Sequence, residues 1–194
     1  MKFSPYRMFA LLGLLALGGC AGSNETDSTD TVSSTETDPS GNAGDDVANG
    51  LSLERQVAII EQRLEATNTQ NWDLWESLHT ADAIRTAPEL EEPLRGAPAM
   101  RAAIETLGTA FPDYHLELQQ AFGQGPWLAV RLHTTGTMTG PLTLSDGVVV
   151  PPTGQGIEQD WSALVRFEGD HIAEFHEFYD QLLLMVQLGL ITPP

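Results

Sequence analysis

The residues best suited to chemistry lie close together near the C-terminal end of the chain, in the segment Phe175 to Asp180 (FHEFYD). Successive side chains of an extended strand point to opposite faces, so Phe175, Glu177 and Tyr179 are expected on one face. A carboxyl group between two aromatic rings is poorly hydrated, which favours its protonated form and suits proton transfer near neutral pH. We therefore expect Glu177 to be a catalytic acid or base, with Phe175 and Tyr179 lining a substrate site. The alternative is a carboxylate exposed at the edge of a sheet.

Two other polar residues flank this carboxyl group. His176 falls on the face opposite Glu177, so we rank it below His133 as a catalytic partner and keep it as a substrate-binding candidate. Asp180 can cap the helix that follows, because its carboxylate can accept from the free N–H groups of a first turn. It is also a catalytic candidate.

His133 and Arg85 are the polar candidates from elsewhere in the chain. His133 shares a strand face with Arg131, and the alternative to a catalytic role is a structural hydrogen bond. Arg85 lies in an expected loop (Ala83 to Leu94) and could pair with a buried carboxylate or with an oxyanion of a substrate. The alternative for Arg85 is a solvated arginine among glutamates.

Several kinds of catalysis have no residues to support them. Lys2 is the only lysine and Cys20 the only cysteine, and both precede the folded part of the chain. The sequence has no G-x-S-x-G elbow, phosphate-binding loop, dinucleotide fingerprint or zinc-type Cys/His spacing. We therefore expect no metal and no cofactor, which leaves acid/base chemistry.

The surrounding pattern predicts an α+β domain that can position these residues. Apolar residues at helical spacing predict three helices, and alternating patterns predict a sheet of about four to six strands. The helices are expected over Leu53 to Thr67, Trp72 to His79 and Gly96 to Gly108. The clearest strands are Tyr114 to Phe122, Trp127 to Thr137, Trp161 to Phe167 and His171 to Tyr179. A hairpin turn is expected at Asp146-Gly147, and a short helix from Gln181 ends at Gly189.

The segment Pro151 to Gly189 (PPTGQGIEQDWSALVRFEGDHIAEFHEFYDQLLLMVQLG) also resembles a known family. Its order of PPTG, strand, RFEGDHI turn, EFHEFYDQ and LLLMVQLG is similar to the end of SnoaL-like polyketide cyclases, also called ester cyclases. The similarity needs no gap here and reaches back, more weakly, to about Leu53. It implies the nuclear transport factor 2-like fold, in which a curved antiparallel sheet wraps around N-terminal helices to form a cone with an apolar pocket.

The resemblance also implies a reaction, an intramolecular aldol closure of a polyketide ester without metal or cofactor. The family typically reads E-H-W-D-x-x-D, and its two Asp residues fall on Glu177 and Asp180. Glu177 would remove the α-proton, and His133, His176, Tyr179 or Arg85 could steady the enolate. The chain departs from the family at Met138, where the family commonly has the His of G-T-H-T-G.

The N-terminal part of the chain predicts export and lipid attachment. Residues 1–19 read as a signal peptide, with Lys2 and Arg7 before a short apolar run. Leu17-Gly18-Gly19-Cys20 resembles a bacterial lipobox, which implies lipidation of Cys20. Residues 20–50 would then be an acidic, disordered tether and residues 51–194 the folded domain. Because Ala21 is not the Asp of an inner-membrane retention signal, we expect anchoring in the cell envelope, with the outer membrane favoured.

Charge limits the partners of the domain. The formal net charge of −18 argues against nucleic acid, because phosphate binding needs clustered Lys and Arg. The expected partner is a small hydrophobic molecule, with the membrane reached through Cys20, and a homodimer is one expected assembly. Two functions stay open: a cofactor-free cyclase, isomerase or hydrolase acting on a hydrophobic carbonyl compound, or a membrane-tethered binding module without catalysis.

Overall fold

The computed structural model of the protein describes residues 51–144 and 147–192. The expected signal peptide, Cys20 and the acidic tether lie outside the described residues, as does Asp146 of the expected hairpin turn. In the described part of the chain, every helix is too short or too polar to cross a bilayer.

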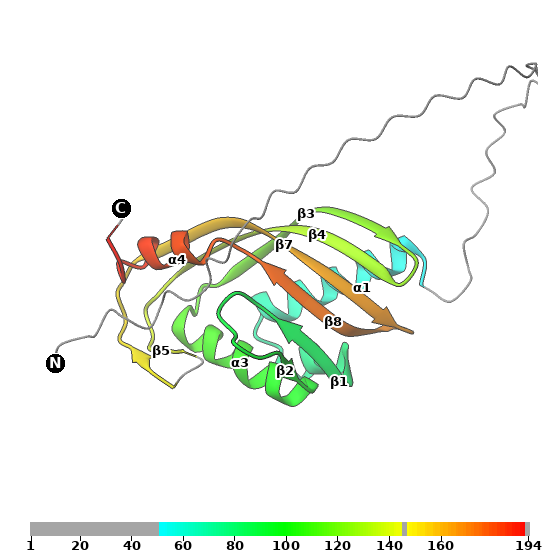
Figure 1. Ribbon diagram of the computed structural model, residues 1–194, viewed down its shortest axis with the longest axis horizontal. Helices are drawn as coiled ribbons and strands as arrows, with labels where there is room; N and C mark the ends of the chain where they lie inside the picture. Colours follow the sequence, from blue (N-terminus) through cyan, green and yellow to red (C-terminus); the bar gives the residue numbers. More distant parts are fainter. Residues whose placement is uncertain (1–50, 145–146, 193–194) are drawn as a thin grey trace, which may run out of the picture. The chain divides into compact units, whose positions relative to one another are not determined.

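The fold is built on one six-stranded sheet with the strand order β2-β1-β8-β7-β4-β3 (Figure 1). Neighbouring strands are antiparallel except β1 and β8, which run parallel. Two short strands form a separate ribbon, β5 (Leu142–Thr143) with β6 (Val149–Val150). The strands of the main sheet are β1 (His79–Thr86), β2 (Leu94–Arg95), β3 (His115–Gln124), β4 (Trp127–Thr137), β7 (Gly156–Glu168) and β8 (His171–Phe178).

Four helices accompany the sheet within residues 51–144 and 147–192, and polar side chains begin three of them. They are α1 (Leu53–Asn68), α2 (Trp72–Ser77), α3 (Ala97–Ala110) and α4 (Gln181–Gln187). Ser52 Oγ accepts from the Arg55 N–H at 3.3 Å, and Asp180 Oδ1 accepts from the Leu183 N–H at 2.8 Å. Both predicted helix caps are thereby confirmed. α3 instead starts after Gly96, whose φ of 87° suits a residue without Cβ.

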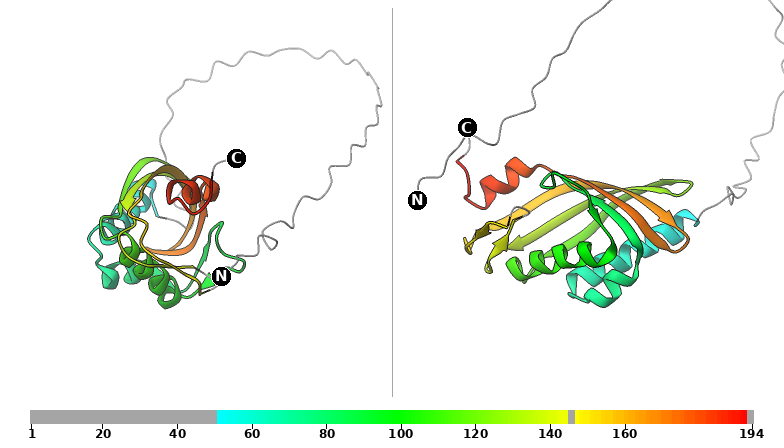
Figure 2. Two further views of the ribbon diagram at one scale, coloured as in Figure 1. Left: turned by 90° about the vertical axis from the view of Figure 1, so that its left-hand side faces the viewer. Right: turned by 60° about the horizontal axis from the view of Figure 1, so that its bottom comes forward.

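The sheet is curved, and its concave face packs on α1. Alternate residues of β7, from Ile157 to Phe167, are buried while those between them are exposed or half-buried. Ile59, Ile60 and Leu64 of α1 share one apolar core with the buried residues of β4 and β7. Figure 2 shows the strands arching on one side, with the N-terminal helices on the other. The nuclear transport factor 2-like α+β cone predicted from the sequence is therefore confirmed.

Two predicted element boundaries were wrong, and both change where residues of the candidate site lie. The helix expected over Trp72 to His79 ends at Ser77, and His79 already begins β1. The expected loop from Ala83 is in fact strand up to Thr86, so Arg85 lies on a strand. The strand forms because β8 pairs with it, a long-range contact that local residue preferences do not reveal.

Candidate functional site

Glu177 lies on the concave face of β8 and is held by an arginine of the neighbouring strand. Arg85 Nε donates to Glu177 Oε1 at 2.8 Å, and Arg85 Nη2 donates to Glu177 Oε2 at 2.7 Å. The two side chains are only 16% and 10% exposed. The parallel register places Arg85 opposite Phe175, two residues before Glu177 on the same face. This is a two-pronged, charge-assisted contact of the kind that fixes both side chains.

Two further side chains extend the pair into a network. Arg85 Nη2 also donates to Glu89 Oε1 at 2.9 Å, and the Tyr179 hydroxyl donates to Glu89 Oε2 at 2.6 Å. Burial acts to lower the pKa of Arg85, but the charges and hydrogen bonds of Glu177 and Glu89 outweigh it and raise this pKa. Burial, together with the bond to Glu89, raises the pKa of Tyr179. Arg85 therefore stays cationic and Tyr179 stays protonated at ordinary pH.

The surroundings of Glu177 differ from the expectation of a carboxyl group among apolar rings. Phe175 is buried on the same face, and Tyr179 packs against the apolar core, as the alternation predicted. The sequence allowed Arg85 to pair with a buried carboxylate, and the structure shows this pair with Glu177; the alternative of a solvated loop arginine was wrong, because the residue lies on a strand. Glu177 is consequently a paired carboxylate in the structure and not an isolated one.

A second buried arginine lies near this pair. Arg63 of α1 is 3% exposed, and its guanidinium carbon is 3.8 Å from the ring centre of Phe175 and 5.0 Å from that of Trp75. Burial lowers its pKa to about 10, while the charge of Glu177 opposes that shift. Sequence reasoning missed Arg63, although its position four residues after Ile59 puts it on the buried stripe of α1.

Arg63 also contacts a buried histidine at the start of β1. His79 Nδ1 donates to the Trp75 carbonyl oxygen at 2.8 Å, which leaves Nε2 to accept from Arg63 Nε at 3.4 Å. Burial, followed by the charge of Arg63, lowers the pKa of His79 to about 3. His79 is therefore neutral near pH 7 and does not balance the charge of Arg63. The negative charge with the largest effect on the pKa of Arg63 is the carboxylate of Glu177.

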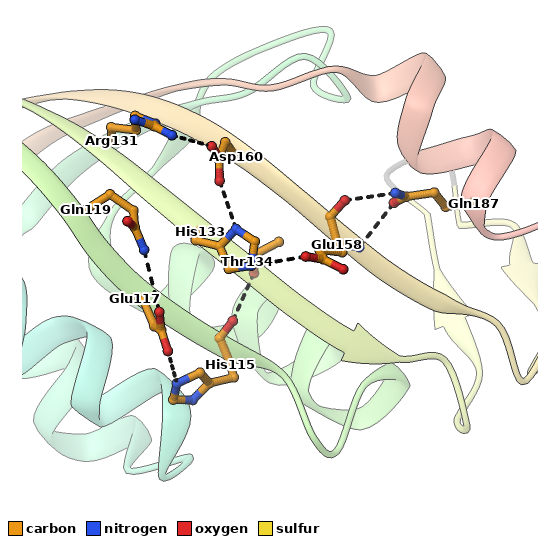
Figure 3. Close-up of polar contacts among 9 residues, drawn as sticks. All are labelled: His115, Glu117, Gln119, Arg131, His133, Thr134, Glu158, Asp160 and Gln187. Carbon is orange, nitrogen blue, oxygen red and sulfur yellow. Dashed lines mark hydrogen bonds and ion pairs between the residues drawn. The ribbon is translucent and has the colours of Figure 1, made fainter.

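His133 lies on the convex face of the sheet, as Figure 3 shows. Its Nδ1 is 2.8 Å from Asp160 Oδ1, and Arg131 Nη2 donates to Asp160 Oδ2 at 2.6 Å. The hydrogen bonds from Arg131 and His133 lower the pKa of Asp160. His133 is thus separated from Glu177 by the sheet, so the expectation that it assists Glu177 in catalysis is corrected: the period of two along β4 directs it outward.

The other two flanking candidates make contacts away from Glu177. His176 lies on the convex face, as predicted, where its ring nitrogens contact Thr86 Oγ1 at 2.9 Å and Glu174 Oε2 at 2.8 Å. It therefore cannot contact a substrate held at Glu177. Asp180 caps α4 with its carboxylate, as the sequence predicted, and its part in proton transfer stays a prediction.

An open groove of about 430 Å³ lies at the end of β8, next to this network. Its lining comes from the ends of several strands: Pro88, Arg131, Asp160, Trp161, Ser162, Phe178, Tyr179 and Asp180. Tyr179 is therefore shared between the groove and the network that holds Glu177. Among residues 51–144 and 147–192, no group of three or more His, Cys, Asp and Glu side chains is placed to hold a metal ion.

Met138 occupies the position at which the resemblance places a histidine. Its side chain is fully buried in an apolar cluster with Phe111, Ile157 and Leu188. This position contributes packing and offers no polar group to a substrate.

Removing Arg85 should strongly destabilise the domain, because a buried carboxylate then loses its partner. We expect Arg85→Leu to lower the free energy of unfolding by about 3–5 kcal/mol, measured by urea denaturation. Arg55→Leu removes the exposed Arg55–Asp170 pair (45% and 54% exposed) and should cost about 0–1 kcal/mol. Equal losses in these two variants would show that the buried pair does not hold the fold.

His79 should make stability depend on pH. Its pKa in the folded protein, about 3, is below the ordinary value of 6.5, so the unfolded chain takes up the proton first as the pH falls. The stabilisation is complete above pH 6.5 and is lost progressively toward pH 3. In this range the free energy of unfolding should fall by about 1.4 kcal/mol more per pH unit in the unaltered protein than in His79→Gln. Urea denaturation at several pH values measures the two slopes, and identical slopes would contradict the expectation.

Comparison with known proteins agrees with this architecture. A family model described as SnoaL-like polyketide cyclase matches residues 58–188. No curated protein sequence matches the chain.

Three solved structures have the same fold. A protein from Jannaschia sp. CCS1, named as a candidate SnoaL-like polyketide cyclase, has a TM-score of 0.64 and 19% identity over 78% of this chain and 100% of its own. TsrD from Streptomyces laurentii has a TM-score of 0.62 and 23% identity over 73% of this chain and 99% of its own. A Catenulispora acidiphila protein described as having a ketosteroid isomerase-like fold has a TM-score of 0.57 and 15% identity, over 70% of this chain and 97% of its own. The family match spans most of the described domain, and the chain belongs to the SnoaL-like polyketide cyclase family.

Proposed function

We propose that the domain is a cofactor-free acid/base catalyst that acts on a hydrophobic carbonyl compound by aldol cyclisation, isomerisation or hydrolysis. The observation that carries the proposal is the Arg85–Glu177 pair on the concave face of the sheet. A base beside a fixed cation is the arrangement that enolate formation needs, since the base takes the proton and the cation meets the new negative charge.

Glu177 acts as the base in this reaction. The α C–H bond of the ketone breaks, its proton moves to a Glu177 oxygen, and its electron pair shifts onto the carbonyl oxygen to form an enolate. In a cyclisation, the enolate carbon then bonds to a second carbonyl carbon, whose oxygen takes up the proton. Each carboxylate oxygen has two lone pairs, so a bond to Arg85 leaves acceptor capacity on Glu177.

Arg85 stabilises the enolate. Arg85 contacts Glu177 and Glu89 through Nε and Nη2, while Nη1 carries two further N–H groups. These can meet the enolate oxygen without breaking the ion pair. Tyr179, whose hydroxyl donates to Glu89, holds Glu89 beside Arg85 and thereby helps to fix the guanidinium.

A non-catalytic binding module for a small hydrophobic ligand is the second candidate. Two observations favour it. Arg85 engages both oxygens of Glu177, and buried Met138 replaces a polar group expected in the family. In this alternative the cone and the groove hold a ligand, and the ion pair serves only to close the core.

Exchange of α-protons for deuterium distinguishes the two candidates. In D₂O, the protein should accelerate exchange at the α-carbon of 1-tetralone, followed by ¹H NMR. Glu177→Gln should reduce the acceleration by about 10²- to 10⁴-fold, the usual contribution of a general base. His133→Gln, on the opposite face of the sheet, should leave it unchanged. Binding of 1-tetralone without any acceleration would reject the catalyst and support the binding module.

We further propose that the domain is anchored in the cell envelope through Cys20, outside the cytoplasm. The lipobox-like Leu17 to Cys20 segment supports lipidation, and the acidic residues that follow it would be repelled by anionic headgroups. Attachment would therefore depend on the lipid and not on the domain surface.

Mass spectrometry of the full chain purified from bacterial membranes tests the anchor. We expect a mature N-terminus at Cys20 that carries acyl chains, and no such peptide from Cys20→Ala. An unmodified Cys20 thiol, or an N-terminus beyond this residue, would contradict lipidation.

A further inference from the structure

The end of the domain formed by α4 and the β5–β6 ribbon is apolar on its outside. Ten large apolar side chains of the described residues are exposed, and five of them belong to this end. Leu144, Val148 and Val149 come from the ribbon and its connection, and Leu182 and Leu183 come from α4, with exposed fractions between 38% and 57%. Single apolar side chains on a surface are ordinary, but a group of them marks a surface that contacts another apolar phase or molecule.

A buried cluster holds the two elements together. Leu142 and Val150 of the ribbon and Leu184 of α4 pack against the same apolar cluster, which contains Met138. Figures 1 and 2 accordingly show α4 and the ribbon at one end of the domain, whereas α1 begins at the other end. The five exposed side chains therefore belong to one surface, which we call the apolar end.

The apolar end is almost free of charge in an otherwise acidic chain. The sequence has 27 acidic and 9 basic residues, yet Asp146 is the only charged residue of positions 138–157, and positions 181–194 have none. α4 consists of apolar residues between two glutamines, and none of its residues is buried. A helix that is apolar on all sides is normally covered, so the exposed side of α4 suits an apolar environment.

The chain that precedes the domain indicates what this environment is. About 30 residues (20–50) connect the domain to Cys20, for which we propose lipid attachment. A polar chain of that length has a typical reach of about 30 Å, so it would keep the domain close to the bilayer surface. A tether of this kind gives a high effective concentration, at which even a small apolar surface can bind the bilayer.

We propose that the apolar end docks on the bilayer and orients the tethered domain. Leu182 and Leu183 of α4, with Leu144 and Val149 of the ribbon, enter the boundary between headgroups and acyl chains to a depth of about 5–10 Å. This inference rests on the proposed anchoring through Cys20. The acyl chains attach the protein, and the apolar end decides how the attached domain lies on the surface.

The charges around the apolar end predict which lipid it prefers. Glu158 contacts Gln187 of α4 through its backbone, and Asp180 caps the helix. Their carboxylates, like the acidic chain as a whole, would be repelled by anionic headgroups. Docking should therefore be strongest on neutral phosphatidylcholine and weaker when phosphatidylglycerol is mixed in, and high salt should reduce this difference.

Fluorescence of the lipidated full chain in phosphatidylcholine vesicles tests the contact. Cys20 is the only cysteine and acylation blocks its thiol, so Leu183→Cys can be labelled selectively with nitrobenzoxadiazole. We expect this label to lose emission when brominated phosphatidylcholine replaces the ordinary lipid, because bromine on the acyl chains quenches only a fluorophore that reaches them. Gln124→Cys with the same label should keep its emission, since exposed Gln124 ends β3 at the opposite end of the domain.

Charged substitutions on the apolar end should remove the quenching without detaching the protein. Val149→Glu with Leu182→Glu, added to labelled Leu183→Cys, should restore the emission, because a carboxylate is costly to place in the bilayer. The matched control replaces two exposed apolar residues elsewhere, Leu53→Glu with Phe122→Glu, and should leave the quenching unchanged. Flotation with the vesicles should be the same for all variants, since the acyl chains hold them.

The outcomes separate docking from anchoring and from self-association. Protein that floats with the vesicles while the Leu183→Cys label stays unquenched would overturn docking and leave the anchor in place. A chain that does not float would overturn both. If a second copy covers the apolar end instead, the label resists brominated lipid and its emission changes as the protein is diluted in lipid, which also overturns the inference.

Discussion

The need to pair charges inside the cone is the constraint on which the rest of the structure depends. Arg63 and Arg85 both enter the core, and Glu177 is the carboxylate that interacts with both. An unpaired charge at such a depth would cost several kcal/mol in folding free energy. The parallel pairing of β1 with β8 avoids this cost, because it places Arg85 beside Glu177. It brings Arg85 to Glu177 with two hydrogen bonds, while Arg63 is held over the ring of Phe175.

The sheet separates two polar systems that are close in sequence. Glu177, Gln159 and Trp161 belong to the concave face, whereas His176, Asp160 and His133 belong to the convex face. His176 is next to Glu177 in sequence, Asp160 lies between Gln159 and Trp161, and His133 pairs with Asp160 across two strands. The backbone of the sheet nevertheless separates the convex side chains from the concave ones. Candidate residues that alternate along a strand therefore cannot be combined into one site, however near their numbers are.

The Arg85–Glu177 ion pair is compatible with catalysis and with simple ligand binding. The difference is whether the Arg85 guanidinium binds an enolate oxygen in addition to Glu177, or binds Glu177 alone. If the enolate oxygen is bound by Arg85 while Glu177 keeps free lone pairs, the pair is a base with a fixed counter-charge. If Arg85 only neutralises Glu177, the pair is structural. Buried Met138 contributes packing and no polar group, so polar contacts to a ligand would have to come from other residues.

The amino-acid sequence by itself determined the fold class, the helix caps at Ser52 and Asp180, and the alternation of β8, because these follow from local periodicity and capping. It also pointed to Glu177 as the carboxylate on the inner face. Only the tertiary structure decided what Glu177 touches, since Arg85 reaches it through a parallel pairing of strands about ninety residues apart. The outward direction of His133 was likewise decided by long-range packing. Local patterns show which residues share a face, but only the assembled sheet shows which face is enclosed and which neighbours it brings.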